Sequence, residues 1–208
     1  MKTANAGPSL FIDTPRFEKS MKDYTILTPY FTPTLSPLIP SVMKVLGYHV
    51  ETLPQSAGLS ADMGLRFANN EVCYPATLVV GDFVEALKSG KYDLQKTGRC
   101  HYPDGGQCRA SNYFGLIKHA LVSAGFKDVP VISLATSSSI QNDQPGFHIN
   151  WLKIAKITVT TILFSDCLSK FYNAAVVREK KKGLQKNCAA STSTSPRCKS
   201  KRTIPRGF

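Results

Sequence analysis

Strand-like and helix-like hydrophobic patterns alternate along most of this chain. Short β-branched or alternating apolar runs predict buried strands at residues 24–29, 48–53, 97–102 and 129–134. Apolar residues at helical spacing predict helices at residues 38–46, 61–69, 75–89 and 110–124, and one long or broken helix over residues 150–182. This alternation indicates an α/β fold, with a mostly parallel sheet and helices on both of its faces.

The pattern divides the chain into three parts. Residues 1–22 are mixed in character and are expected to form a flexible leader, and residues 23–183 form the α/β domain. Residues 184–208 are of low complexity and basic, and we predict a disordered tail. The leader does not resemble a signal peptide, and the apolar stretch at 154–164 is too short and too polar to span a bilayer. A cytoplasmic protein without a membrane partner is therefore expected.

Charge is concentrated at the C-terminal end. The chain of 208 residues has a formal net charge of +12, and the segment 178–208 holds ten Lys or Arg and one Glu. A basic end of this kind can touch nucleic acid or a membrane surface. A solvated tail is the simpler interpretation, so no nucleic-acid partner is predicted.

Two cysteines occupy the most distinctive segments. Cys73 and Cys108 each lie just ahead of a predicted helix, where the helix N-terminus stabilises a thiolate. Thiolates in a reducing compartment bind metals more often than they form disulfides, which favours an iron–sulfur cluster. The alternative is two buried cysteines that act as small core residues. Cys108 follows a predicted strand and belongs at the carboxyl edge of the sheet, whereas a short helix precedes Cys73 and leaves its place open.

The cysteine segments also carry a family resemblance. The run from about residue 24 to residue 183 resembles the 2-hydroxyacyl-CoA dehydratase and dehydratase-activase family, most closely a segment of its large fused activase-type proteins. The matching pieces are residues 64–76 (Gly-Leu-Arg-Phe-Ala-Asn-Asn-Glu-Val-Cys-Tyr-Pro-Ala), 86–93 (Ala-Leu-Lys-Ser-Gly-Lys-Tyr-Asp), 105–113 (Gly-Gly-Gln-Cys-Arg-Ala-Ser-Asn-Tyr), and 124–126 with 129–134.

The resemblance implies a Rossmann-like (flavodoxin-like) lobe that holds a [4Fe–4S]-type cluster through Cys73 and Cys108. It also implies a component of ATP-driven one-electron transfer in anaerobic metabolism. In that family an actin-like ATPase activator passes an electron to a dehydratase partner, which removes water from a 2-hydroxyacyl-CoA by radical chemistry. This chain carries no ATPase signature, so it is expected to be inactive alone and to depend on such an activator domain or dehydratase partner.

The resemblance leaves the ligand set incomplete, because a third cysteine cannot be assigned. A homodimer that shares one cluster would supply four thiolates from two copies. The tail matches nothing in the family, and a truncated or frame-shifted product would have this form.

Residues around Cys108 are candidates to support the cofactor. The glycines let the backbone approach a cluster closely, Arg109 offsets its negative charge, and the polar residues add hydrogen bonds. Turn formation, a salt bridge and helix capping are the simpler roles for the same residues. The glycine turn could instead hold a nucleotide or CoA phosphate, which gives a second function: a non-catalytic binding module. A non-functional fragment is the third. The candidate cofactor-binding residues are Gly105, Gly106, Arg109, Ser111 and Asn112, with Tyr113 as a further hydrogen-bonding residue.

The other cysteines carry weaker signals. Cys167 lies in the predicted long helix, where core packing is its expected role. No paired CxxC, no zinc-type spacing and no Ser/His/Asp arrangement accompanies the cysteines, so neither a zinc site nor a hydrolase is predicted.

Overall fold

A four-stranded parallel sheet forms the centre of the molecule. The computed structural model describes residues 14–69, 71–101, 113–133 and 145–178. Its strands are β1 (Thr25–Thr28), β2 (His49–Thr52), β3 (Thr97–His101) and β4 (Val131–Ser133), in the order β2-β1-β3-β4. All neighbouring pairs are parallel. The chain steps from β1 outward to β2 and then crosses to β3 and β4, so its winding direction reverses between β1 and β3.

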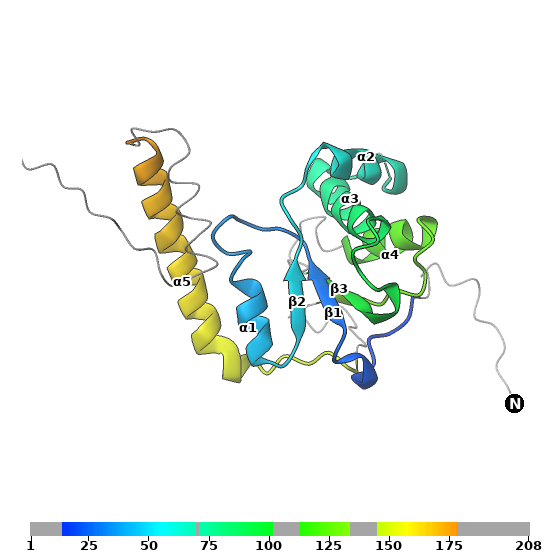
Figure 1. Cartoon of the computed structure of the whole chain (residues 1–208), viewed down its shortest axis with the longest axis horizontal. Helices are drawn as coiled ribbons and strands as arrows, with labels where there is room; N and C mark the ends of the chain where they lie inside the picture. Colours follow the sequence, from blue (N-terminus) through cyan, green and yellow to red (C-terminus); the bar gives the residue numbers. More distant parts are fainter. Residues whose placement is uncertain (1–13, 70, 102–112, 134–144, 179–208) are drawn as a thin grey trace, which may run out of the picture.

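Helices cover both faces of this sheet. Figure 1 shows α2 (Gly58–Phe67), α3 (Tyr74–Lys88) and α4 (Tyr113–Ser123) on one side, and α1 (Ile39–Val45) and α5 (Trp151–Val176) on the other. Two short 3-10 turns, η1 (Lys19–Met21) and η2 (Leu94–Lys96), precede β1 and β3. The α/β architecture predicted from the hydrophobic pattern is confirmed, and each predicted strand and helix is present in the described residues.

The molecule has two hydrophobic cores, one on each face of the sheet, and the alternation of side chains along the strands explains them. Leu27 faces the cluster formed with α3 and α4, whereas its neighbour Ile26 faces the cluster formed with α1. On β4, Val131 belongs to the cluster with α3 and α4, and Ile132 belongs to the cluster with α1. Successive side chains of a strand point to opposite faces, so a sheet covered on both sides needs apolar residues at consecutive positions.

Residues 14–22 belong to the folded body, although the sequence assigns them to a flexible leader. Phe17 is fully buried in the cluster on the α1 side of the sheet. Its ring meets Tyr24 and Phe147 edge to face, with centroids 6.2 and 6.4 Å apart. The Phe17 carbonyl also accepts a hydrogen bond from the Gly146 N–H at 2.7 Å. The described body therefore starts at residue 14, within the segment assigned to the leader.

Helices α2 and α3 are in backbone contact. A Cβ on Gly64 would overlap the carbonyl oxygen of Thr77, and a Cβ on Gly81 would overlap the carbonyl oxygen of Ser60. Each helix thus places a small residue and a glycine four positions apart at the contact, Ser60 with Gly64 and Thr77 with Gly81. This close approach fixes α3 relative to α2, and with it the position of the α3 N-terminus.

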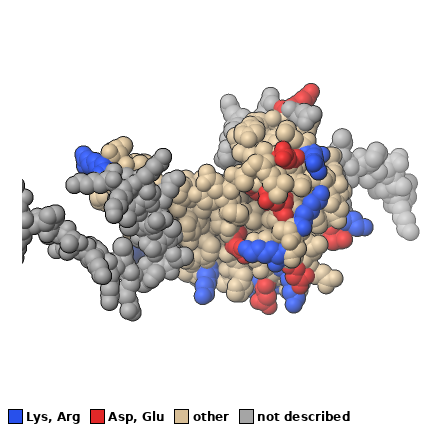
Figure 2. Space-filling model, turned by 45° about the horizontal axis from the view of Figure 1, so that its top comes forward, with Lys and Arg blue, Asp and Glu red and all other residues tan. Residues whose placement is uncertain are grey.

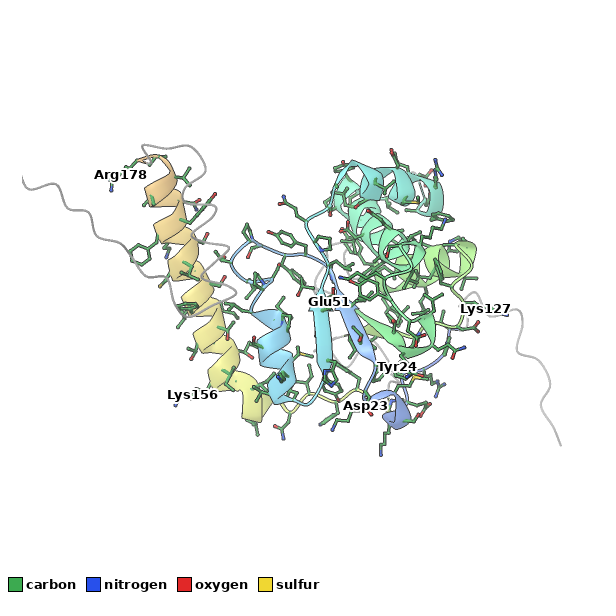
Figure 3. The ribbon with its side chains drawn as sticks, in the orientation of Figure 1. Asp23, Tyr24, Glu51, Lys127, Lys156 and Arg178 are labelled. Atoms are coloured by element: carbon green, nitrogen blue, oxygen red, sulfur yellow. The ribbon has the colours of Figure 1, made fainter. Side chains whose placement is uncertain are left out.

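The segment that follows α3 is tied to the edge strand. Glu51 on β2, marked in Figure 3, accepts hydrogen bonds from Lys91 Nζ at 2.6 Å and from the Tyr92 hydroxyl at 2.7 Å. Partial burial of Glu51 acts to raise its pKa, but the two hydrogen bonds and the Lys91 charge outweigh it and leave the pKa below its ordinary value. The cation and the hydroxyl thus favour the charged form of a carboxylate at the sheet edge.

Candidate cysteine site at the start of two helices

Cys73 is the N-cap residue of α3. Its backbone is extended, and its carbonyl accepts hydrogen bonds from the N–H groups of Ala76 at 2.9 Å and Thr77 at 3.2 Å. Pro75 lies in the first turn, where its fixed φ suits a helix start and its missing N–H costs nothing. The Cys73 side chain makes no cap hydrogen bond and is exposed. The sulfur is therefore available for interactions outside its own helix.

The sulfur of Cys73 meets a residue from the second distinctive segment. Cys73 Sγ lies 3.1 Å from the hydroxyl oxygen of Tyr113, forty residues further along the chain. Tyr113 is the first residue of α4 and is largely buried, at 8% exposure, so its ring is held in place by the core. The structure thus brings Cys73 next to the end of the segment that contains Cys108, a proximity that spacing alone left open.

The contact also places Cys73 relative to the sheet. Helix α4 connects β3 to its parallel neighbour β4, so its first turn lies on the side of the sheet where β3 ends. The Tyr113 side chain therefore links the first turn of α4 to Cys73 at the start of α3, near the carboxyl edge. Both helix dipoles favour negative charge there, which suits a thiolate or a bound anion.

Most of the remaining predicted site residues fall outside the described residues. Cys108 lies in the segment 102–112, which the structure does not describe, as do the candidate cofactor-binding residues Gly105, Gly106, Arg109, Ser111 and Asn112. Tyr113 is the part of that group that the structure does describe. Its hydroxyl lies within hydrogen-bond distance of Cys73 Sγ, and its ring packs in the core.

Cys167 does not pack in the core, and that prediction was wrong. It is exposed on α5, which packs against α1 on the side of the sheet opposite α3. A long helix with apolar residues on several sides leaves some of them in solvent, and the sequence pattern does not say which. Cys167 is therefore not close to Cys73.

A buried polar network that the sequence did not reveal links α2 to α3. Asp82 is buried on α3 and accepts a hydrogen bond from the Ser56 hydroxyl at 2.7 Å, while Ser60 donates to Glu85 at 2.7 Å. Burial raises the pKa of Asp82 above its ordinary value; the serine hydrogen bonds oppose this rise, and the charge of Glu85 adds to it. The available signal was a carboxylate within the apolar stretch of α3, between Gly81 and Phe83.

Replacing Asp82 with asparagine is expected to stabilise the protein at pH 7 by up to about 1 kcal/mol, because it removes a buried charge and keeps the hydrogen bonds. The folded state binds the Asp82 proton more tightly than the unfolded chain does. Its contribution to stability is therefore full below about pH 4 and is lost as the pH rises through the raised folded pKa. Urea denaturation of Asp82→Asn between pH 3.5 and 7 should show a flatter profile than that of the parent.

The matched control is Asp62→Asn, which removes an exposed carboxylate from α2. If Asp82→Asn lowered stability at pH 7 while Asp62→Asn did not, the environment would favour the charged form of Asp82, contrary to this account.

The chain was compared with protein-family models, curated proteins and solved structures, and none of them matches it. Among the described residues, no three His, Cys, Asp or Glu side chains are grouped closely enough to hold a metal ion. Within the same residues, no helix combines the length and the apolar character needed to cross a bilayer, although α5 has 26 residues.

Proposed function

We propose that this chain is an iron–sulfur electron-transfer domain, related to components of the 2-hydroxyacyl-CoA dehydratase and activase systems. The observation that carries the proposal is the contact between Cys73 and Tyr113, because it joins the two cysteine-containing segments among those that carry the resemblance. In this proposal Cys73 and Cys108 are cluster ligands. The chain would relay an ATP-driven electron for dehydration of a 2-hydroxyacyl-CoA and would act together with an activator or dehydratase partner.

The fold part of the proposal is a Rossmann-like, flavodoxin-like domain. The order β2-β1-β3-β4 corresponds to the first four strands of the flavodoxin-like order, 2-1-3-4-5. In such sheets ligands bind outside the carboxyl ends of the strands, at the point where the winding direction reverses. Here that point lies between β1 and β3, and the segment containing Cys108 follows β3 directly.

Among the described residues, Cys73 is suited to bind one iron of a cluster. Cys73 offers an exposed thiol at a helix N-terminus, which is a suitable iron ligand. The remaining ligands would come from Cys108, from a second copy of the chain or from a partner. When bound, an iron–sulfur cluster supplies one-electron redox chemistry.

The chain's own residues would hold and tune that site. Tyr113 can donate its hydroxyl proton to the Cys73 thiolate, which orients the sulfur and withdraws charge from it. The N-termini of α3 and α4 offset negative charge, and Arg109 is proposed to add to this effect.

The test is the iron and sulfide content of cysteine variants prepared anaerobically. Cys73→Ser and Cys108→Ser are expected to lose most of the iron that the parent binds, because serine is a poor ligand for these clusters. Cys167→Ser is the matched control, since it removes an exposed cysteine on α5, and it should keep the parent iron content. Equal iron in all three variants would contradict the assignment. Circular dichroism would verify that each variant is folded.

A second candidate function rests on the same strand order. The reversal between β1 and β3, followed by the Gly105-Gly106 segment, also suits a module that binds a nucleotide or CoA phosphate. Saturable binding of ATP or CoA by an iron-free chain, measured by calorimetry, would favour this function over the first.

A further inference from the structure

Most of the large apolar side chains of α5 face solvent, whereas several of its hydroxyl side chains face the body. Ser165 is buried and donates a hydrogen bond to the Thr34 hydroxyl at 3.0 Å, and the hydroxyl oxygen of Thr158 is shielded from solvent. By contrast, Leu152 is 93% exposed and Leu163 is 61% exposed. A surface helix usually has the reverse arrangement, with its apolar residues packed on the core. The exposed side of α5 is therefore better suited to an apolar environment than to water.

The spacing of residues along α5 separates its two sides. The residues of the inner side recur at intervals of three or four and lie toward the body: Ile154, Thr158, Thr161 and Ser165. Leu152, Val159 and Leu163 precede three members of this set by two residues, which is a rotation of about 200° around the helix. They therefore lie on the opposite, outer side, and Phe164 and Phe171 are exposed on its flank. We call these five exposed apolar residues the outer patch.

The outer patch lies on the side of α5 that points away from the sheet. Figure 1 shows α5 at one end of the body, beyond α1, against which it packs. Charged side chains gather over the part of the body with α2 to α4, and the adjoining surface toward α5 is mostly uncharged (Figure 2). A broad surface can therefore approach the outer patch from the side of α5 that faces away from α1.

Positive charge accompanies the outer patch. Lys156 lies on the outer side of α5, four residues after Leu152 (Figure 3). Lys170 pairs with Asp166, the one acidic residue in the sequence of α5, at 2.8 Å, so this pair adds little net charge. The segment 178–208, which follows α5, holds ten Lys or Arg and one Glu. Apolar side chains together with a net positive charge are the features by which a helix binds an anionic lipid surface.

Two other occupants of the outer patch fit these observations less well. A second copy of the chain would bring together two molecules that each carry a net charge of +12, and these would repel each other. A nucleic acid would pair with the cations but would leave the apolar side chains of the outer patch without an apolar partner. A lipid surface satisfies both features, because its acyl region accepts the apolar side chains and its headgroups attract the cations.

We propose that α5 lies along the surface of a bilayer that contains anionic phospholipids. The outer patch enters the boundary between headgroups and acyl chains, and Lys156 contacts the headgroups. The sequence predicts no membrane partner because its most apolar stretch is too short and too polar to span a bilayer, but a helix that lies on the surface needs no span. Cys73 belongs to α3 on the other side of the sheet, so lipid at α5 does not occupy the proposed cluster site.

The test measures co-sedimentation of the full chain with vesicles of two compositions. One consists of phosphatidylcholine alone, and the other contains about 30% phosphatidylserine. At about 0.1 M salt we expect the chain to bind the anionic vesicles about tenfold more tightly than the neutral ones, because the cations add to the apolar contribution.

Two variants of the outer patch test the apolar contribution. Leu163→Ser and Phe171→Ser should each weaken binding to the anionic vesicles about fivefold, because each removes an apolar side chain from the lipid boundary. The control is Leu65→Ser on α2, which removes a leucine of similar exposure, 57%, outside the outer patch. This control should bind both vesicles as the parent does.

A charge reversal tests the ionic contribution. Lys156→Glu should weaken binding to the anionic vesicles about tenfold, because it places a negative charge at the headgroups. Lys127→Glu makes the same change in net charge on the side of the molecule opposite α5 (Figure 3), and its effect should stay below about twofold. Circular dichroism verifies that each variant is folded, and if one of them fails to fold, the variants at the other positions still give the result.

Three results would overturn the proposal. The first is equal binding to both vesicles, or binding to neither. The second is binding that Leu163→Ser and Phe171→Ser leave unchanged, which would mean that charge alone attracts the chain to lipid. The third is a dimeric mass in solution that Leu163→Ser converts to a monomer, because a second copy would then cover the outer patch. None of these readouts involves iron, so the outcome is independent of the proposed cluster.

Discussion

Replacing Gly81 with alanine is expected to lower the free energy of unfolding by about 3 kcal/mol. The new Cβ would overlap the carbonyl oxygen of Ser60; the position of the Cβ is fixed by the α3 backbone and the oxygen belongs to the α2 backbone, so neither can rotate away. Relief therefore requires α2 and α3 to separate, which opens their interface and displaces the N-terminus of α3 that carries Cys73. Urea denaturation with comparison of midpoints at constant slope measures the change.

Gly115→Ala is the matched control. Gly115 lies in α4, and a Cβ at that position would have no neighbouring atom within 4 Å. Alanine there should stabilise the protein by about 0.5–1 kcal/mol, because glycine is the weaker helix former. The same substitution is thus expected to lower the free energy of unfolding at Gly81 and to raise it at Gly115. Similar effects at both positions would mean that α2 and α3 are not in backbone contact.

Truncating Phe17 to alanine is expected to cost about 3–5 kcal/mol, the usual range for a fully buried phenylalanine. The ring fills the space between Tyr24, Phe147 and the glycine of β3, Gly98, whose missing side chain makes room for it. Thermal or urea denaturation would show the loss as a large fall in the midpoint.

The control is Phe171→Ala on α5, where the phenylalanine ring is 73% exposed. That change should stay within about 0.5 kcal/mol, as is usual for surface positions. If Phe17→Ala were as mild as Phe171→Ala, residues 14–22 would be the flexible leader that the sequence suggests.

Local signals in the sequence were sufficient for the elements of this fold. The helices predicted to end at residues 89 and 124 are each followed by a glycine with left-handed backbone, Gly90 with a φ of 70° and Gly125 with a φ of 92°. The strand at β1 followed from a β-branched run that ends at proline. Such features depend on a few neighbouring residues, so they can be recognised without the tertiary structure.

Features that depend on distant residues were missed or left open. Phe17 lies in a mostly polar segment, and its place in the core depends on partners far along the chain, such as Gly98 on β3 and Phe147. Cys167 shows the converse, because an apolar stretch does not say which side of a helix is covered. The glycines at the contact of α2 and α3 become informative only when the two helices are seen to touch.

The candidate site shows the same difference between local features, which the sequence reveals, and contacts between distant residues, which it does not. The sequence singled out Cys73 and the segment from 105 to 113, since cysteine, glycine and helix starts are local patterns. It could not show that these segments meet, because the contact of Cys73 with Tyr113 depends on how α3 and α4 pack. Asp82 was overlooked because its partners lie more than twenty residues earlier, Ser56 in the loop before α2 and Ser60 on α2.

The most direct test of the proposed function is the iron and acid-labile sulfide content of the unmodified chain, purified and reconstituted without oxygen. The account predicts a brown protein with iron and sulfide in nearly equal amounts, bound in a fixed ratio to the chain or to its dimer. A folded chain that stays colourless and free of iron after reconstitution would contradict it.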